Sequence, residues 1–358
     1  MPLPLLHRAS GFPAFMSSRR MLSLILRFSA ISLVFGLFAC GSSDSTVQRS
    51  PAPKQLSVVT TFLPITMFTE AVAGECADVT ALIPPSLGPH DFQASPSDLA
   101  TLSKASVLVQ NGLGIEEFLD DLVRSAANPD LVVIDSSRGV ATIKPAEDSR
   151  VELADDHHDH KHHHHADHHE PAKAIENDRH DHRHGEFDPH IWLDPLRAAQ
   201  QVENIRDGLI AADPSCADRY KSNADSYIAK LQDLNVEFAA SLKPYQGKTF
   251  VAFHDFATYF ANRYALKAEF LVDLPEMNPS PGDLQRVAAQ VKASGLKALL
   301  TEPQEGNRSF HALAKDLGVN IVQFNPLETG SAGSAKRPDT YIDVMRSNVS
   351  NLLKAIAN

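Results

Sequence analysis

The chain has 358 residues, of which 43% are hydrophobic, and carries a formal net charge of −11 at pH 7. That length allows two domains of ordinary size. The acidic balance argues against nucleic acid as a partner, because nucleic-acid binding needs a basic face, and it favours cations instead.

Residues 1–40 have the pattern of a secretory signal. Arg19 and Arg20 precede a short apolar run that ends at Cys40, and a basic flank before such a run is typical of these signals. The run is too short for a permanent transmembrane span. Its last four residues, LFAC, resemble the lipobox of bacterial lipoproteins, which predicts lipidation of Cys40 and a membrane anchor. Plain secretion is the alternative. We expect residues 41–55 to be a flexible tether.

Strand-like and helical patterns alternate after the tether. The strand-like runs are LSVVTTF, DVTALI, SVLVQNG and LVVID. The helical runs between them are PITMFTEAVAG, PSDLATLSKA and IEEFLDDLVRSAA. Strands that alternate with helices of this length predict parallel βαβ units. We therefore expect an N-terminal α/β lobe over residues 56–195.

A histidine-rich segment, about residues 145–186, interrupts this lobe. Its centre is DDHHDHKHHHHADHHE, which has no apolar period and cannot bury enough surface to fold. We predict a disordered accessory loop with several weak metal sites, because each bound metal must order a flexible chain. The alternative is a dispensable solvated insertion.

One long helical pattern follows the first lobe. Its apolar side chains recur at steps of four and three residues on one side: Tyr220, Ala224, Tyr227, Leu231, Leu234, Phe238 and Leu242. Pro214 and Pro244 bracket a helix of roughly 30 residues, or about 45 Å. We expect linker helices over residues 196–245, with the long helix spanning two lobes and limiting hinge motion. A coiled coil is the alternative, but the pattern is short for one.

The alternation resumes in a C-terminal lobe, residues 246–358. The strand-like runs are TFVAFH, KAEFLVD, LKALLTEP and VNIVQFNP. The helical runs are DFATYFANRY, PGDLQRVAAQVKASG and DTYIDVMRSNVSNLLKAIA. The predicted fold is α/β with two lobes, each a mainly parallel four-stranded sheet flanked by helices. One long rigid helix joins them.

Three histidines outside the histidine-rich segment share a setting at the end of a strand or the start of a helix. His90 lies in LGPHDFQASPSD, His190 in FDPHIWLDP and His254 in VAFHDFATYF. Open α/β units bind ligands at this edge of the sheet. Three neutral histidines with one open position form a zinc environment. We therefore predict that these three residues bind a metal ion.

Three aspartates lie beside the candidate ligands in the sequence. Asp91 and Asp255 each follow one, and Asp188 precedes another by two positions. Each could fix a ring tautomer by bonding to the second ring nitrogen. Helix capping is an equal alternative.

Cys76 and Cys216 are the only cysteines after Cys40. An oxidising compartment permits them to pair, but their spacing does not decide whether they do. They do not form a zinc knuckle, so we expect structural roles.

The motifs GPHDFQASPSD, DPHIWLDP, FHDFATYFA, NPSPGDL and TEPQ resemble those of the metal-binding subunits of bacterial ABC-type zinc and manganese importers. The likeness extends from about residue 56 to the C-terminal helix. It implies a cluster A-I solute-binding protein with the metal between two lobes, His90 and His190 coming from the first and His254 from the second. Manganese binders in this family have glutamate at the position of His254. Three histidines resemble the zinc branch, and imidazole prefers zinc to manganese.

The fourth ligand position departs from the family pattern. The family often has an aspartate in a D-P-L stretch of the last strand, where this chain has Asn325 in FNPLETG. An amide oxygen is a weaker donor than a carboxylate. The candidates are therefore Asn325, Glu328 and a water molecule.

The sequence thus predicts a monomeric extracytoplasmic lipoprotein that captures Zn²⁺ and delivers it to an ABC permease. The chain has no P-loop, so the ATPase must be a separate subunit. Both metal-binding regions should weaken as the pH falls through about 6.5, because imidazole must be neutral to bind metal.

We expect no enzymatic activity, but other functions compete with zinc capture. They are a manganese- or iron-binding importer subunit, a metal-dependent adhesin, and a zinc hydrolase. A hydrolase would need Asp255, Glu276 or Glu302 as the base for a metal-bound water. Against it, the chain has no H-E-x-x-H motif.

Overall fold

The computed structural model describes residues 55–144, 186–303 and 308–357. The predicted signal peptide, the lipidation site at Cys40, and almost all of the tether and the histidine-rich loop lie outside the described residues. Both sheets belong to one compact unit, Pro53–Asn358. None of the helices in the described ranges combines the length and the apolar character that a membrane crossing requires.

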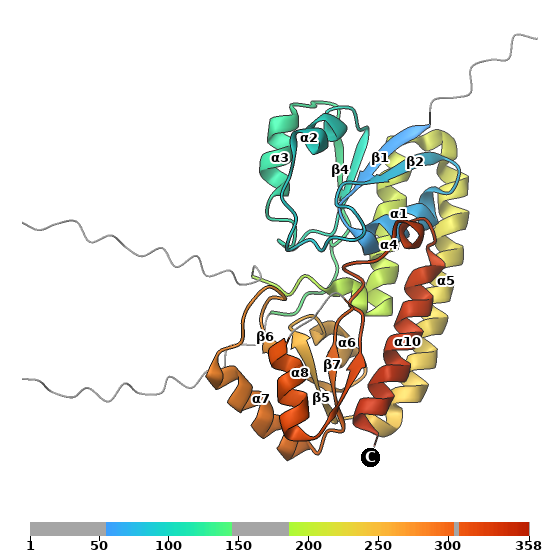
Figure 1. Cartoon of the computed structure of the whole chain (residues 1–358). Helices are drawn as coiled ribbons and strands as arrows, with labels where there is room; N and C mark the ends of the chain where they lie inside the picture. Colours follow the sequence, from blue (N-terminus) through green and yellow to red (C-terminus); the bar gives the residue numbers. More distant parts are fainter. Residues whose placement is uncertain (1–54, 145–185, 304–307, 358) are drawn as a thin grey trace, which may run out of the picture. The chain divides into compact units, whose positions relative to one another are not determined.

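The first sheet is fully parallel, with the strand order β2-β1-β3-β4 (Figure 1). Its strands are β1 Leu56–Thr60, β2 Ala77–Ala81, β3 Val107–Gln110 and β4 Val132–Asp135. The helices between them are α1 Leu63–Ala73, α2 Pro96–Leu102 and α3 Leu119–Ala126. Val59 packs with α2 and α3, whereas its neighbour Val58 packs with α1 in the main core. Alternate residues of the strand therefore bury both faces of the sheet.

The second sheet repeats this arrangement, with the order β6-β5-β7-β8 and parallel pairs throughout. Its strands are β5 Thr249–His254, β6 Lys267–Val272, β7 Ala298–Thr301 and β8 Asn320–Gln323. The accompanying helices are α6 Thr258–Arg263, α7 Pro281–Ser294, α8 Arg308–Leu317, the short α9 Ala332–Ala335, and α10 Asp339–Ile356. The ligand-binding edge, where parallel strands end, is thus available in both lobes.

Two helices connect the sheets, α4 Pro195–Ala212 and α5 Ala217–Leu242. The predicted apolar stripe of α5 is buried along its whole length, and α5 packs against α1, α4 and α10. Helix α5 has 26 residues, or about 39 Å at 1.5 Å per residue. It begins after a 3₁₀ turn, Pro214–Cys216, rather than at Pro214. The predicted long connecting helix is therefore present, slightly shortened.

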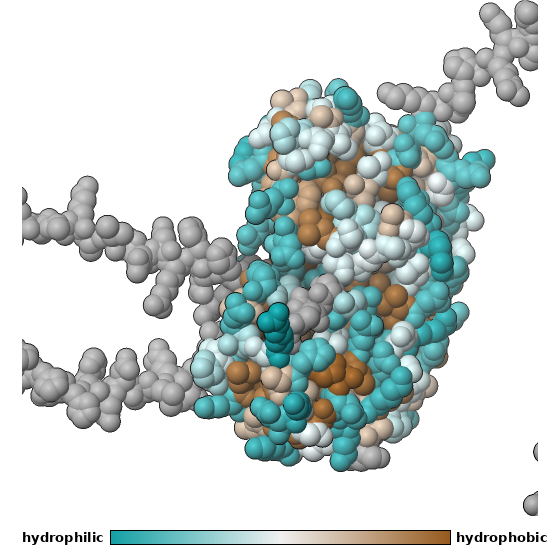
Figure 2. Space-filling view, viewed as in Figure 1, coloured by the Kyte–Doolittle hydropathy of each residue, from teal (hydrophilic) through white to brown (hydrophobic). Residues whose placement is uncertain are grey.

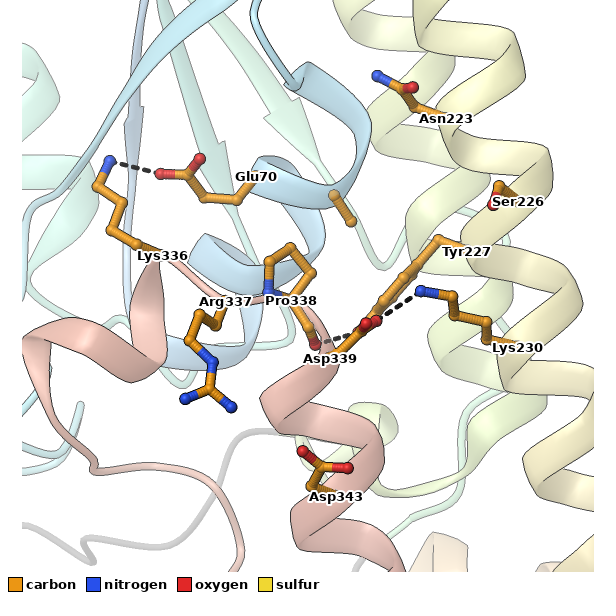
Figure 3. A pocket seen from close by; sticks show the side chains of 11 residues that line it. Glu70, Asn223, Ser226, Tyr227, Lys230, Lys336, Arg337, Pro338, Asp339 and Asp343 are labelled. Atoms are coloured by element: carbon orange, nitrogen blue, oxygen red, sulfur yellow. Dashed lines mark hydrogen bonds and ion pairs between the residues drawn. The ribbon is translucent and has the colours of Figure 1, made fainter.

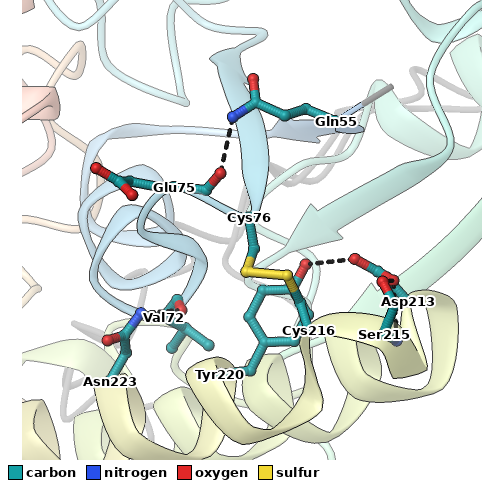
Figure 4. The surroundings of a disulfide bond; sticks show 9 residues. All are labelled: Gln55, Val72, Glu75, Cys76, Asp213, Ser215, Cys216, Tyr220 and Asn223. Atoms are coloured by element: carbon teal, nitrogen blue, oxygen red, sulfur yellow. Dashed lines mark hydrogen bonds between the residues drawn. A yellow bond between two sulfur atoms is a disulfide. The ribbon is translucent and has the colours of Figure 1, made fainter. Parts of the chain in front are cut away.

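A disulfide joins Cys76, at the start of β2, to Cys216, at the start of α5 (Figure 4). The pair closes a sequence separation of 140 residues. Beside it, the Tyr220 hydroxyl donates to Asp213 at 3.3 Å. The pairing that the sequence left open thus ties the first lobe covalently to the connecting helix.

Residues 324–338, here called the return segment, lead from β8 back to the first lobe before α10 begins. Gly330 N donates to Pro85 O at 2.6 Å, and a Cβ on Gly330 would lie 2.7 Å from the Leu63 side chain. Lys336 pairs with Glu70 of α1 and donates to Val79 O at 2.7 Å (Figure 3). A side chain at position 330 would therefore have to displace the end of the Leu63 side chain.

The groove beside the return segment is charged on both sides (Figure 3). It has a volume of about 650 Å³ and lies between α1, α5 and the start of α10. Lys230 donates to Asp339 at 2.7 Å, and the Tyr227 hydroxyl donates to Pro338 O at 2.8 Å.

The face of the molecule that Figure 2 shows is largely hydrophilic, with scattered hydrophobic patches.

Candidate metal centre

Four side chains converge between the two lobes: His90, His190, His254 and Glu328. One ligand atom from each lies within 4.8 Å of the other three. Glu328 Oε1 is 3.3 Å from His190 Nε2, 3.4 Å from His254 Nε2 and 3.8 Å from His90 Nε2. The structure therefore brings together all three predicted histidines and adds a carboxylate.

Each of the four comes from a different part of the fold. His90 lies in the loop between β2 and α2, and His190 immediately precedes the 3₁₀ turn Ile191–Leu193 that leads into α4. His254 is the last residue of β5. Glu328 lies in the return segment. The carboxyl edges of both sheets supply the site, as the parallel topology predicts.

Asp188 orients the His190 ring. Its Oδ1 lies 2.8 Å from His190 Nδ1 and accepts from the His190 backbone N at 2.9 Å. The loop is held from both lobes, because Asn111 Nδ2 donates to Pro189 O at 3.0 Å and the Tyr259 hydroxyl donates to Asp188 O at 2.7 Å. With Nδ1 turned to the carboxylate, Nε2 faces the other three side chains. This is the tautomer-fixing role that the sequence offered for Asp188.

Glu302 performs the same role for His254. Its Oε1 lies 2.6 Å from His254 Nδ1, and both residues are buried. Asp255, which the sequence suggested, instead accepts from the Thr258 hydroxyl at 3.1 Å, and Asp91 is exposed. The sequence prediction therefore missed Glu302 as the partner of His254. It was detectable, because β7 neighbours β5 and Glu302 directly follows β7.

The buried carboxylates change the proton affinity of the site. Burial disfavours the charged form of His190, but Asp188 and Glu328 outweigh it and raise its pKa to about 9. His254 follows the same pattern, with Glu302 and Glu328 holding its pKa well above the usual value against the effect of burial. Burial opposes the ionisation of Glu328, yet the three histidines hold its pKa well below the usual value. A cation that replaces the protons would keep these charges balanced.

Asn325 does not join the cluster. Its side-chain oxygen accepts from Leu327 N at 2.7 Å, and Asn348 bonds to its backbone on both sides, at 2.8 and 2.7 Å. Asn325 therefore shapes the turn that starts the return segment, and of the two protein candidates for the fourth position Glu328 is the one that reaches the histidines.

A cavity of about 180 Å³ leads to the cluster from the surface. The side chain of His90 is 9% exposed, whereas those of His190 and His254 are 0% exposed. The cavity is lined by loop residues of both lobes together with His90 and Glu328. Access to the site is therefore from the His90 side.

The three residues considered as the base of a hydrolase, Asp255, Glu276 and Glu302, lie outside the group of four converging side chains. Glu302 contacts the His254 ring from the side opposite the cluster. Asp255 is buried, and this burial together with Asp188 raises its pKa to about 7. Glu276 is exposed at the cavity mouth. Of the three, Glu302 thus has a hydrogen-bond contact with one of the clustered histidines, and Asp255 accepts from Thr258.

Most of the chain matches one known protein family. Residues 58–355 match the family described as zinc-uptake complex component A, periplasmic, or ZnuA. The chain belongs to this family. The predicted resemblance to the binding subunits of zinc importers is therefore confirmed.

Relatives of this ZnuA-family protein are named for zinc. Zinc-binding protein AdcA of Streptococcus pyogenes is 31% identical over 330 residues, covering 92% of this chain but 60% of AdcA. The high-affinity zinc uptake system protein ZnuA of Bacillus subtilis is 29% identical over 315 residues, covering 88% of this chain and 92% of that protein. This chain thus spans less than two thirds of AdcA and nearly all of the Bacillus protein.

A solved structure supports the fold assignment. Zn(II)-bound AdcA from Streptococcus pneumoniae has a TM-score of 0.66 at 28% identity, covering 85% of this chain and 58% of that chain. The predicted two-lobed α/β architecture is confirmed.

Proposed function

We propose that the protein captures Zn²⁺ outside the cytoplasm and delivers it to an ABC-type permease for uptake. The observation that carries this proposal is the convergence of three imidazole nitrogens and one carboxylate oxygen within 4.8 Å. Zinc in proteins is tetrahedral and binds nitrogen and oxygen ligands at about 2.0–2.2 Å, which places neighbouring ligand atoms roughly 3.3 Å apart. The distances from Glu328 to the histidines, 3.3 to 3.8 Å, suit that geometry.

His90, His190, His254 and Glu328 would hold the ion. The three histidines supply neutral nitrogen donors, and Glu328 supplies one negative charge. A site with three nitrogens favours zinc over manganese, which prefers oxygen donors. The donor set therefore supports the zinc alternative over a manganese-binding subunit. A role as a metal-dependent adhesin is compatible with the same site and is a separate prediction.

Binding and release, rather than bond breaking, would be the work of the site. The lobes are joined by a buried hydrogen bond from Trp192 Nε1 to Pro326 O at 2.8 Å and a partly buried one from Arg263 Nε to Asp194 at 2.8 Å. The buried stripe of α5 adds a continuous packed surface. These contacts favour small displacements of the ligand-bearing loops over a wide hinge opening. Docking on the permease would cause that displacement, and a separate ATPase would drive transport.

The sequence and the disulfide together support an extracytoplasmic location. Cys76 and Cys216 pair, and disulfides persist in oxidising, extracytoplasmic compartments. The lipobox-like LFAC ending at Cys40 supports a lipid anchor. The histidine-rich loop would then act as a local zinc reservoir.

Zinc titration calorimetry at neutral pH on protein starting after Cys40 tests this function. It would be compared with a variant that lacks residues 151–184, and with His254→Ala in that deleted background. We expect the deletion to keep one tight site and His254→Ala to weaken it by orders of magnitude. The control His311→Ala, at an exposed position on α8, should leave the tight site unchanged. Loss of all tight binding on deletion would move the functional site to the loop and contradict the proposal.

A further inference from the structure

The cavity that leads to the metal centre has acidic side chains both at its mouth and at its floor. It is lined by Ser86 to Gly88, His90, Asp91, Pro275, Glu276, Glu328 and Thr329. No lysine or arginine is among the described residues that line it. Asp91 and Glu276 are exposed at the mouth, and Glu328 is buried at the floor. The acidic groups that an entering cation would meet are therefore not offset by any basic side chain among these lining residues other than the His90 imidazole.

The two mouth carboxylates come from different lobes. Asp91 lies in the loop between β2 and α2, and Glu276 lies in the loop between β6 and α7. Neither forms a salt bridge or a side-chain hydrogen bond within the part of the chain that the structure describes, so their charges face the solvent. At the floor, Glu328 Oε1 is buried without a hydrogen-bond partner among the described residues. A buried carboxylate oxygen that faces three histidine nitrogens at 3.3 to 3.8 Å, at the end of an acidic cavity, indicates that the cavity is built for a cation.

We propose that Asp91 and Glu276 form an electrostatic entrance that captures the divalent cation and sets the rate at which it reaches the buried site. The inference rests on the proposed function and adds how the ion arrives. Clefts lined by charge of one sign raise the local concentration of the opposite ion and increase association rates ~10-fold or more. His90 is the ligand next to Asp91 and has the most exposed side chain of the three histidines. It is therefore the first ligand that an entering ion meets.

A steering role differs from a ligand role in which rate constant it changes. Charges outside the final coordination sphere speed the encounter but have little effect on dissociation. Salt screens their effect, since the Debye length falls from about 30 Å at 0.01 M to about 3 Å at 1 M. Loss of a ligand would instead speed dissociation at every salt concentration.

The test uses the single tryptophan of the chain as a reporter. The Trp192 ring is buried, with its centroid 5.1 Å from that of His190, so its emission responds to ion binding at the cleft. Stopped-flow mixing with excess Zn²⁺ would give the association rate constant, and a chelator chase the dissociation rate constant. The variant is Asp91→Asn with Glu276→Gln. The matched control, Asp225→Asn with Asp233→Asn, removes two exposed charges from α5.

We expect the mouth variant to bind zinc ~10-fold more slowly at 10 mM ionic strength and less than ~2-fold more slowly at 1 M. Dissociation should stay within ~2-fold of the unmodified protein, and the control should match the unmodified protein in both rates. Equal association rates in the mouth variant and the control would overturn the entrance, as would a change confined to dissociation. Failure of the unmodified protein to bind zinc tightly would overturn the proposed function itself.

Discussion

The two lobes share one strand order, yet they present their histidines differently. His254 ends the central strand β5, is fully buried and is held by Glu302 from the adjacent strand β7. His90 lies in a loop beyond the edge strand β2, beside exposed Asp91 and the cavity mouth. A residue on a central strand is fixed by the sheet around it, whereas a loop residue is not. The two sheets therefore supply one candidate ligand from a central strand, His254, and one from a partly exposed loop, His90.

The largest expected effect tests this difference directly. His254→Ala should weaken zinc binding ~1000-fold, about 4 kcal/mol, because it also leaves the Glu302 carboxylate buried without its ring partner. His90→Ala should cost ~10 to 100-fold, since water from the cavity can take the vacated position. Competition with a chromophoric chelator measures both affinities, with His311→Ala as the control. Equal losses would mean that the two lobes contribute alike.

The fold was predictable because the alternating patterns are long and their boundaries are marked by proline and glycine. The helix expected to stop at Gly74 does so, and α7 begins at Pro281 and ends before Gly295. The start of α5 was less certain, because Pro214 also suits the 3₁₀ turn that precedes the helix. Periodicity identifies which face is buried, but it does not fix the first residue of a helix.

The metal site was predictable only in part, because some of its residues reach it through segments whose path the sequence pattern does not predict. Histidines that follow strands converge because parallel strands end at one edge. Glu328 was one of three candidates, since its position depends on the path of the return segment, in which Asn325 accepts from Leu327 N and Gly330 N donates to Pro85 O. The pairing of Cys76 with Cys216 likewise depends on where α5 packs.

The disulfide sharpens the comparison, because it anchors the first lobe to α5 while no disulfide among the described residues anchors the second. Replacing both Cys76 and Cys216 by serine should lower the free energy of unfolding by about 3 kcal/mol. Zinc affinity should change little, since neither residue lines the cavity. Urea unfolding measures the first quantity and calorimetry the second. An unchanged unfolding midpoint would show that the tether adds no stability.

Asp188 and Glu302 allow the two lobes to be compared, because each is a carboxylate that orients a histidine ring of the site. Glu302→Gln and Asp188→Asn should each weaken zinc binding by ~10 to 100-fold, because they loosen the rings of His254 and His190. The association rate should be retained, since both residues lie behind the rings, away from the mouth. Stopped-flow rates separate these cases from the entrance variants. A slower association with unchanged dissociation would contradict the orienting role.

Zinc affinity should also depend on pH. In the metal-free site His190 has a pKa of about 9, so it carries a proton at neutral pH that zinc must displace. Affinity should therefore fall about tenfold for each unit that the pH drops below 9, for every proton released. The carboxylates therefore raise the pH at which zinc affinity begins to fall above the value of about 6.5 expected for free imidazole. Calorimetry in buffers of different ionisation enthalpy counts the protons. A constant affinity between pH 8 and 7 would be inconsistent with this prediction.

The return segment also has a consequence for how the polypeptide acquires its structure. The bond between Lys336 and Glu70 joins residues 266 positions apart, and Gly330 reaches back to Pro85. A nascent polypeptide emerges amino end first, so the first lobe stays incomplete until residue 336 has been added. Contacts of such long range slow folding. Premature termination before residue 328 would remove a candidate zinc ligand and deprive α1 of its late partners, leaving a species prone to proteolysis.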